Sequence, residues 1–95
     1  MANLIRKKIR FVGHVQGVGF RATTASIARR YFISGFVRNE SDGSVSLEVQ
    51  GEASVCSSFL AQVQEDLSER IDEMSISEGL VITGQSETEG FRIRS

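Results

Sequence analysis

Polar and apolar residues alternate along the first part of the chain. From Ile5 to Val15, one side of the pattern carries Ile5, Ile9, Phe11, Gly13 and Val15, and the other carries Arg6, Lys8, Arg10 and His14. A period of two residues is typical of a β-strand with one buried and one wet face. We therefore expect a strand here, with Arg6, Lys8 and Arg10 on a solvated face.

Two later stretches have the spacing of amphipathic helices. The first runs from Arg21 to about Tyr31, ends before Gly35, and has an apolar stripe made of Ala22, Ala25, Ile27, Ala28, Tyr31 and Phe32. The second starts near Ser54, with a stripe made of Val55, Cys56, Phe59, Leu60, Val63 and Leu67. Each stripe predicts a helix packed by one face onto a common core.

The remaining stretches predict short strands. Residues 36–39 are β-prone, Ser41, Asp42 and Gly43 have turn chemistry, and 45–50 alternate again before Gly51, which together predict a hairpin. A strand interrupted by Gly79 is expected from Met74 to Thr83, and a short last strand from Phe91 to Arg94.

The order of these elements predicts the fold class. It is βαββαβ with a further C-terminal edge strand, the split βαβ order of α+β ferredoxin-like domains. Right-handed crossovers place both helices on one face of a mixed, mainly antiparallel sheet and leave the other face open. A chain of 95 residues with 40% hydrophobic content forms one domain, here residues 1–95.

Composition bears on the cellular location of the protein. Cys56 is the only cysteine and has no partner for an internal disulfide, no apolar run approaches the ~20 residues of a membrane span, and the basic N-terminus lacks a secretory apolar stretch. These features favour a cytoplasmic protein.

The net charge is 11 − 12 = −1, yet residues 1–39 contain no acid and carry +8, whereas residues 40–95 carry 3 − 12 = −9. Such a split points to an anionic ligand for the first half.

The segment GHVQGVGFR, residues 13–21, is the candidate for binding that anion. Its glycines let successive N–H groups converge on one point, and a helix N-terminus adds unpaired donors. A cation such as Arg21 in the first turn opposes the helix dipole, unless an anion lies between them.

Other interpretations of the segment fit less well. Gly17, Gly19 and Ala22 match the GxGxx[GA] pattern of dinucleotide-binding folds, with Glu40 near the position of a ribose-binding acid. That pattern requires a parallel sheet, whereas an antiparallel hairpin follows the first helix here. An RNA-binding module would use the basic open face, but residues 45–50 and the wet face of the first strand supply no stacking aromatic.

Two further residues, His14 and Cys56, have side chains that take part in catalysis or metal binding in other proteins. His14 is the only histidine, so a metal site around it has no second histidine, and no nucleophile stands beside it for a base to activate. We expect it to be a surface residue flanking the loop. Cys56 lies on the apolar stripe of the second helix and is expected to be buried and inert.

Residues 13–21 and the following GFVRNESDGSVSLEVQG, from Gly35, closely resemble the two signature segments of acylphosphatases, small enzymes that hydrolyse carboxyl phosphates. The resemblance covers about residues 9–52. Residues 67–73 depart from it, because the family usually has a glycine–proline pair there.

The resemblance implies a site and an activity. A phosphate would be bound by the backbone of Val15, Gln16, Gly17, Val18, Gly19 and Phe20 and by Arg21, and Asn39 would orient the attacking water. No metal or cofactor is implied, the substrate is a small acyl phosphate, and inorganic phosphate is a product and competitive inhibitor. A monomer without nucleic-acid or membrane partners is expected. The alternative is a phosphate-binding regulatory domain, or a module like the one in hydrogenase maturation proteins, without useful turnover. The end of the chain four residues after Phe91 favours the free-standing enzyme.

Overall fold

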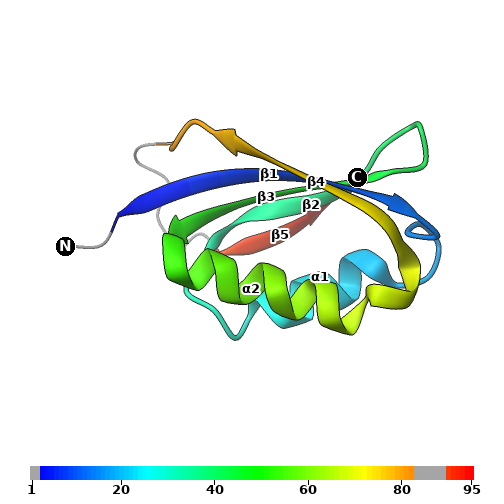
Figure 1. Cartoon of the computed structure of the whole chain (residues 1–95), viewed down its shortest axis with the longest axis horizontal. Helices are drawn as coiled ribbons and strands as arrows, with labels where there is room; N and C mark the ends of the chain where they lie inside the picture. Colours follow the sequence, from blue (N-terminus) through cyan, green and yellow to red (C-terminus); the bar gives the residue numbers. More distant parts are fainter. Residues whose placement is uncertain (1–2, 83–89) are drawn as a thin grey trace.

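The computed structural model describes residues 3–82 and 90–95, and its elements follow the expected order (Figure 1). They are β1 (Leu4–Gly13), α1 (Phe20–Ala28), β2 (Ser34–Asn39), β3 (Val45–Glu52), α2 (Ala53–Asp66), the short 3₁₀ helix η1 (Ser68–Arg70), β4 (Ile71–Gly79) and β5 (Phe91–Arg94).

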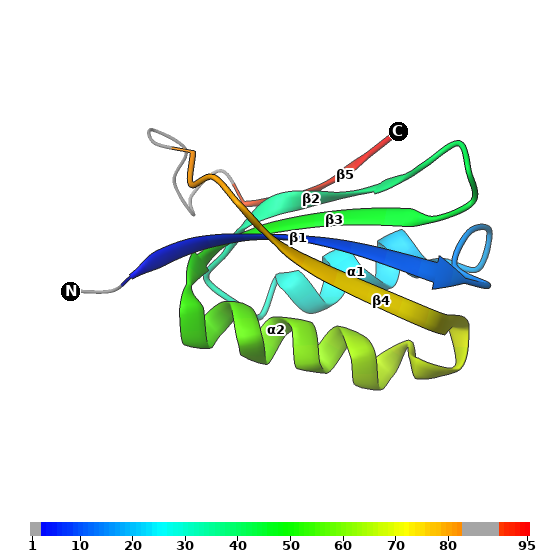
Figure 2. The same ribbon diagram turned by 45° about the horizontal axis from the view of Figure 1, so that its top comes forward.

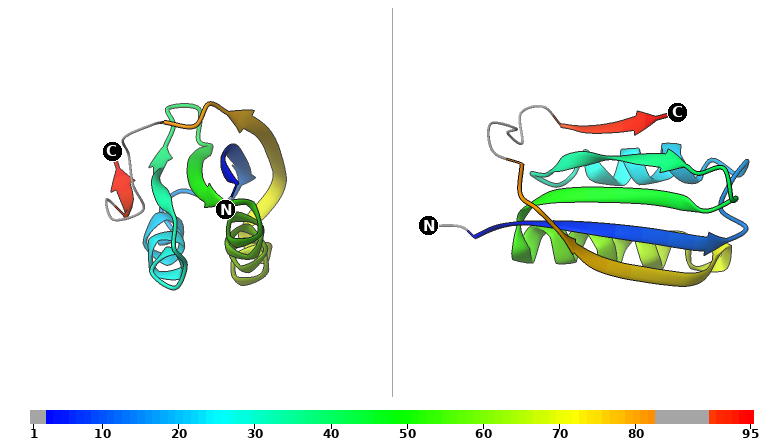
Figure 3. Two further views of the ribbon diagram at one scale, coloured as in Figure 1. Left: turned by 90° about the vertical axis from the view of Figure 1, so that its left-hand side faces the viewer. Right: turned by 90° about the horizontal axis from the view of Figure 1, so that it is seen from above.

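The strands form one sheet in the order β4-β1-β3-β2-β5. Neighbouring strands are antiparallel except β2 and β5, which are parallel. Both helices lie on the same face of the sheet, and none of the described residues forms a helix on the opposite face (Figures 1 and 3). The α+β ferredoxin-like fold predicted from the element order is confirmed.

The core lies between the sheet and the two helices. Inward positions of β1 and β3 alternate as predicted, and α2 contributes its apolar stripe, so the centre is filled by Ile9, Phe11, Val37, Val45, Leu47, Val49, Cys56, Phe59 and Val63. Burial of these side chains provides the main driving force for packing the helices on the sheet. The expectation that Cys56 is buried is confirmed.

Several predicted boundaries were wrong. Helix α1 ends at Ala28 instead of Tyr31, because the N–H groups of Arg30 and Tyr31 bond to carbonyls three residues back and tighten the chain into a turn. Phe32, placed on the apolar stripe, is 67% exposed in the following loop. Gly35 lies inside β2. Residues 67–73 contain η1, and β4 begins at Ile71 instead of Met74.

The prediction that Arg6 is solvated was also wrong. Its side chain is only 4% exposed, and its guanidinium donates to Glu48 Oε1 (2.8 Å) and Gln50 Oε1 (3.3 Å) on β3. Gln50 in turn exchanges two hydrogen bonds with the backbone of Ile82 (2.9 and 3.1 Å). Residues 80–82 therefore cross one end of the otherwise open face (Figures 2 and 3). Strand β4 stops at Gly79, and Thr83 of the predicted strand lies outside the described residues.

Candidate active site

The loop between β1 and α1 is fixed to the core at both ends. The side chains of Val15 and Phe20 are each 1% exposed, and the Phe20 ring packs against that of Phe11 with centroids 5.1 Å apart. These two anchors hold the intervening backbone at the end of the sheet. Residues 15–20 therefore enter the site as backbone, while their large apolar side chains stabilise the fold.

Gly17 and Gly19 have a left-handed backbone. Their φ angles are 77° and 78°, a region that costs other residues free energy and glycine little. A Cβ at either position would meet no atom within 4 Å. The two glycines are thus required by conformation, and the space beside them is open. Gly19 is the N-cap of α1, so the unpaired N–H groups of the first helical turn lie next to this space.

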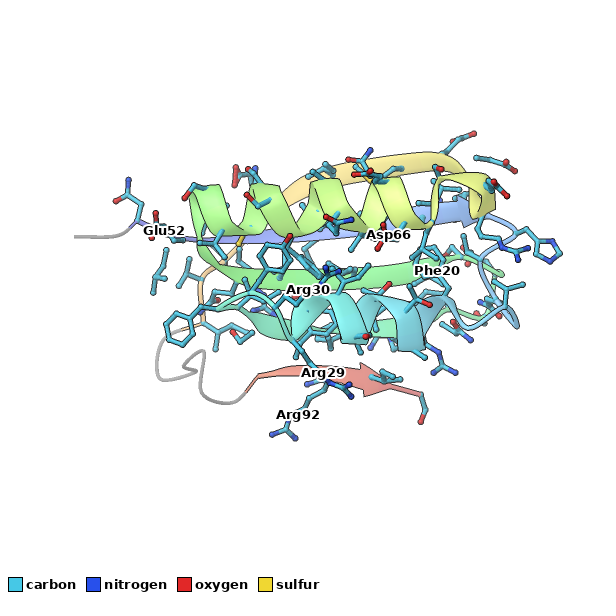
Figure 4. The ribbon with its side chains drawn as sticks, turned by 90° about the horizontal axis from the view of Figure 1, so that it is seen from below. Phe20, Arg29, Arg30, Glu52, Asp66 and Arg92 are labelled. Atoms are coloured by element: carbon cyan, nitrogen blue, oxygen red, sulfur yellow. The ribbon has the colours of Figure 1, made fainter. Side chains whose placement is uncertain are left out.

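Arg21 is the second residue of α1 and is half-buried. One of its guanidinium nitrogens, Nη1, donates a hydrogen bond to the Arg94 carbonyl at 2.8 Å. The carbonyl belongs to β5, which runs alongside α1 in Figure 4, where Phe20 marks the first residue of the helix. The first turn of α1 holds no acidic residue that would neutralise Arg21. Positive charge from the guanidinium and from the helix N-terminus therefore gathers at one place.

Asn39 is the last residue of β2 and is half-buried. Its side-chain oxygen Oδ1 is buried and accepts no hydrogen bond within the described part of the chain. A buried acceptor without a donor is costly, and a bound water or ligand would satisfy it.

The side chain of Gln16 joins the glycine loop to the β2–β3 turn. Its Nε2 donates to the carbonyls of Glu40 (2.8 Å) and Ser44 (2.9 Å), which flank that turn. Glu40 follows Asn39 directly in the chain. One side-chain amide therefore holds the loop and Asn39 at a fixed separation. The sequence analysis did not predict this role, because it assigned only the backbone of Gln16 to the site.

The turn itself is stabilised by its acidic residues. Hydrogen bonds from Ser44 and Arg10 hold the pKa of Asp42 far below its usual range, and Arg10 Nη2 lies 2.8 Å from the carboxylate. The pKa of Glu40 is lowered by hydrogen bonds from Ser46 and Arg38. Both carboxylates are thus held in the charged form by hydrogen bonds in and around the turn.

One cavity of about 200 Å³ connects these features. It is lined by Val15, Gly17, Gly19, Phe20, Arg21, Ala22, Asn39 and Ile93. The structure thus brings the glycines, Arg21 and Asn39 together, as the sequence predicted. The side chain of Gln16 points to the turn, and Val18, half-buried, lines a separate hollow beside residues 65–70. Ala22 and Ile93 were not predicted to border the site.

The other candidate residues lie outside this cavity. His14 is exposed, as expected, and does not line it. Burial raises the pKa of the Cys56 thiol to about 11, so this thiol stays protonated and unreactive at neutral pH. Within residues 3–82 and 90–95, no three histidine, cysteine or acidic side chains are grouped to hold a metal ion. No described helix has the length and apolar character needed to cross a membrane.

Known proteins of one family resemble this chain in sequence and in fold. The family model for acylphosphatases matches residues 7–93. An acylphosphatase of Salinibacter ruber is 40% identical over 90 residues, which make up 94% of this chain and 92% of that relative. The crystal structure of an acylphosphatase from Bacillus subtilis superimposes with a TM-score of 0.80 at 26% identity, covering 96% of this chain and 99% of that one.

A larger protein contains a similar unit. Full-length HypF, solved in a phosphate- and nucleotide-bound form, matches all of this chain with a TM-score of 0.80 and 29% identity, but the match covers only 12% of HypF. The family model and the Salinibacter relative, by contrast, span most of the chain. This chain belongs to the acylphosphatase family.

Proposed function

We propose that this acyl phosphate hydrolase binds the phosphoryl group of its substrate between the glycine loop and Arg21, and attacks it with a water held by Asn39. The observation that carries the proposal is the single cavity shared by Gly17, Gly19, Arg21 and Asn39. The backbone N–H groups of residues 15–20 supply neutral donors, and the guanidinium supplies two-pronged, charge-assisted ones.

Stabilisation of charge is the main task of the protein in this reaction. The phosphoryl oxygens carry negative charge that redistributes as the P–O bond to the acyl group breaks, and little covalent chemistry is left for side chains. Donors fixed before the reaction stabilise that charge without having to reorganise. Gly17 and Gly19 supply such a fixed backbone, and Arg94 holds the Arg21 guanidinium beside it.

The water reaches phosphorus from the side of Asn39. The water oxygen forms the new P–O bond while the old bond from phosphorus to the acyl oxygen breaks, and the acyl group departs as a carboxylate. An asparagine amide does not titrate, so it orients the water and takes no proton. The proton passes to a phosphate oxygen or to solvent. The mechanism requires no metal, because the Arg21 guanidinium and the backbone N–H groups stabilise the negative charge.

We propose that inorganic phosphate, the product, competes for the same cradle, and that the protein acts as a monomer of a single domain. The single cysteine favours the cytoplasm. Nucleic acid is not an expected partner: Phe36, on the open face, is 8% exposed beneath the guanidinium groups of Arg38 and Arg94, so the described part of that face presents no uncovered aromatic ring for a base to stack on.

The alternative of a phosphate-binding domain without turnover is less well supported. A HypF-like role rests on a match to 12% of a larger protein, whereas a protein named acylphosphatase matches over 92% of its length. The test is phosphate release from a model acyl phosphate by chelator-treated protein, beside an Arg21→Ala variant. We expect turnover from the first and a loss of about 10²-fold or more in the second. Binding of phosphate by wild-type protein without any turnover would support the alternative instead.

A further inference from the structure

The cavity of the candidate site has an apolar edge on one side. Ile93 of β5 lines it, and its side chain is 48% exposed. Ile93 pairs with Val37 of β2, which is buried in the core. Paired residues share a face of the sheet, as do residues two apart in a strand, so Ile93 and Asn39 lie on the side of the helices. Ala22, in the first turn of α1, is the other exposed apolar side chain that lines the cavity, because Val15 and Phe20 are buried.

An isoleucine has no role in binding a phosphoryl group, because it offers no hydrogen-bond donor. The donors that line the cavity are the loop backbone and the Arg21 guanidinium. A side chain exposed at the edge of this cavity is therefore placed to contact the part of the substrate beyond the phosphoryl group. In an acyl phosphate that part is the acyl group.

The size of the cavity limits this contact to the first atoms of the acyl group. Its volume of about 200 Å³ is below the ~300–1,000 Å³ of pockets that enclose a small-molecule ligand. The acyl group thus extends outward past Ile93 and Ala22. Selectivity then depends on one or two apolar side chains.

The charges near this edge do not favour an acyl group with a second negative charge. Arg21 is the one charged residue lining the cavity among the described residues, and its free donors are assigned to the phosphoryl group by the proposed function. Arg94 follows Ile93, but its guanidinium stacks on the Phe36 ring at 4.3 Å, on the opposite face of the sheet. Arg92 points outward from the strand at the sheet edge (Figure 4).

We propose that Ile93, with Ala22, forms an acyl-group contact that favours acyl phosphates bearing an aromatic or branched apolar group over acetyl phosphate and over those bearing a second carboxylate. This inference rests on the proposed function. Burial of one to two methylene equivalents against Ile93 corresponds to a preference of about 4- to 15-fold. The preference affects kcat/KM of the larger substrates and leaves the phosphoryl site unchanged.

The test compares Ile93→Ala with a matched control. Ile76 is 49% exposed on β4, at the opposite edge of the sheet, so Ile76→Ala removes an equally exposed isoleucine far from the cavity. We expect Ile93→Ala to lower kcat/KM for benzoyl phosphate by about 4- to 15-fold and for acetyl phosphate by less than about 2-fold. Inorganic phosphate should bind the variant as it binds wild type, and Ile76→Ala should change neither substrate.

A second variant tests the same contact from the opposite direction. Ile93→Lys places a cation at the edge, and we expect it to shift the preference from benzoyl phosphate toward succinyl phosphate. Equal losses of Ile93→Ala on benzoyl and acetyl phosphate, with wild type active on both, would overturn the acyl contact and leave the proposed mechanism intact. Absence of wild-type turnover on every acyl phosphate would overturn both.

Discussion

The guanidinium of Arg21 donates a hydrogen bond of 2.8 Å to the main-chain carbonyl of Arg94. The contact links the start of α1 to the end of β5 through two residues that are 73 positions apart in sequence. A guanidinium has five N–H donors in a planar fork, so one bond to Arg94 fixes its orientation and leaves donors for phosphoryl oxygens. Strand β5 thus orients the Arg21 guanidinium, which is the cation of the proposed phosphate cradle.

Inorganic phosphate should stabilise the folded protein more than its ionic strength alone explains. The cradle exists only in the folded state, so a ligand bound there at a hundred times its dissociation constant adds about 2.7 kcal/mol to the free energy of unfolding. Thermal unfolding in phosphate and in chloride at equal ionic strength provides the measurement. Equal shifts of Tm in the two salts would show that no specific phosphate site exists.

Much of this site could be predicted because its signals are local. The φ angles of Gly17 and Gly19 and the start of α1 follow from neighbouring residues. The contributions of Gln16 and Ile93 could not be predicted, because each depends on a distant segment. The Gln16 side chain reaches carbonyls 24 and 28 residues away, and Ile93 reaches the cavity only through the parallel pairing of β5 with β2.

The same reason explains the errors in the fold. Alternation along β1 correctly predicted which of its faces meets the core. It could not indicate that residues 80–82 cross the other face, where Gln50 holds Ile82 and the Arg6 guanidinium is buried. Burial of a single residue depends on the path of the whole chain, whereas periodicity reports only on its own element.

Activity should be independent of added metal and nearly flat between about pH 5 and 8. The mechanism uses no side chain as acid or base, so no group has to titrate in that range. His14 is exposed and outside the cavity, and His14→Gln should retain most of the turnover. Rates measured with EDTA across this pH range check both statements. A bell-shaped pH profile that disappears in His14→Gln would assign the histidine a catalytic role.

Gln16→Ala should lower kcat more than it lowers phosphate affinity. The variant loses the two hydrogen bonds that hold the loop to the β2–β3 turn, so Asn39 is no longer fixed relative to the cradle. Misplacement of a reacting group by about 1 Å can cost up to about 10²-fold in rate. Gln62→Ala on α2, which loses only a surface bond to Asp66, is the matched control. Equal kinetics in the two variants would mean that Gln16 is not a positioning residue.

Asp42→Asn should change how stability depends on acid. The pKa of the Asp42 carboxyl is held below its usual value of 3.8 in the folded protein, so its contacts contribute stability above that pH. They are lost as the pH falls from about 4 through the lowered pKa. The urea midpoint of wild type should therefore exceed that of the variant at pH 6, and the gap should close toward pH 2. A difference in urea midpoint that stays constant over this range would mean that the charge of Asp42 does not contribute to stability.

The central claim is that Arg21 binds the phosphoryl charge and Asn39 positions water. Phosphate affinity, measured by calorimetry beside single-turnover rates for Arg21→Ala and Asn39→Ala, tests that division of roles most directly. We predict that Arg21→Ala loses both affinity and turnover, the latter by about 10²-fold or more, and that Arg21→Lys restores little because an ammonium lacks the planar fork. Asn39→Ala should keep phosphate affinity and lose about 10²-fold in turnover. Loss of phosphate binding in a folded Asn39→Ala protein would contradict the account and make Asn39 part of the cradle.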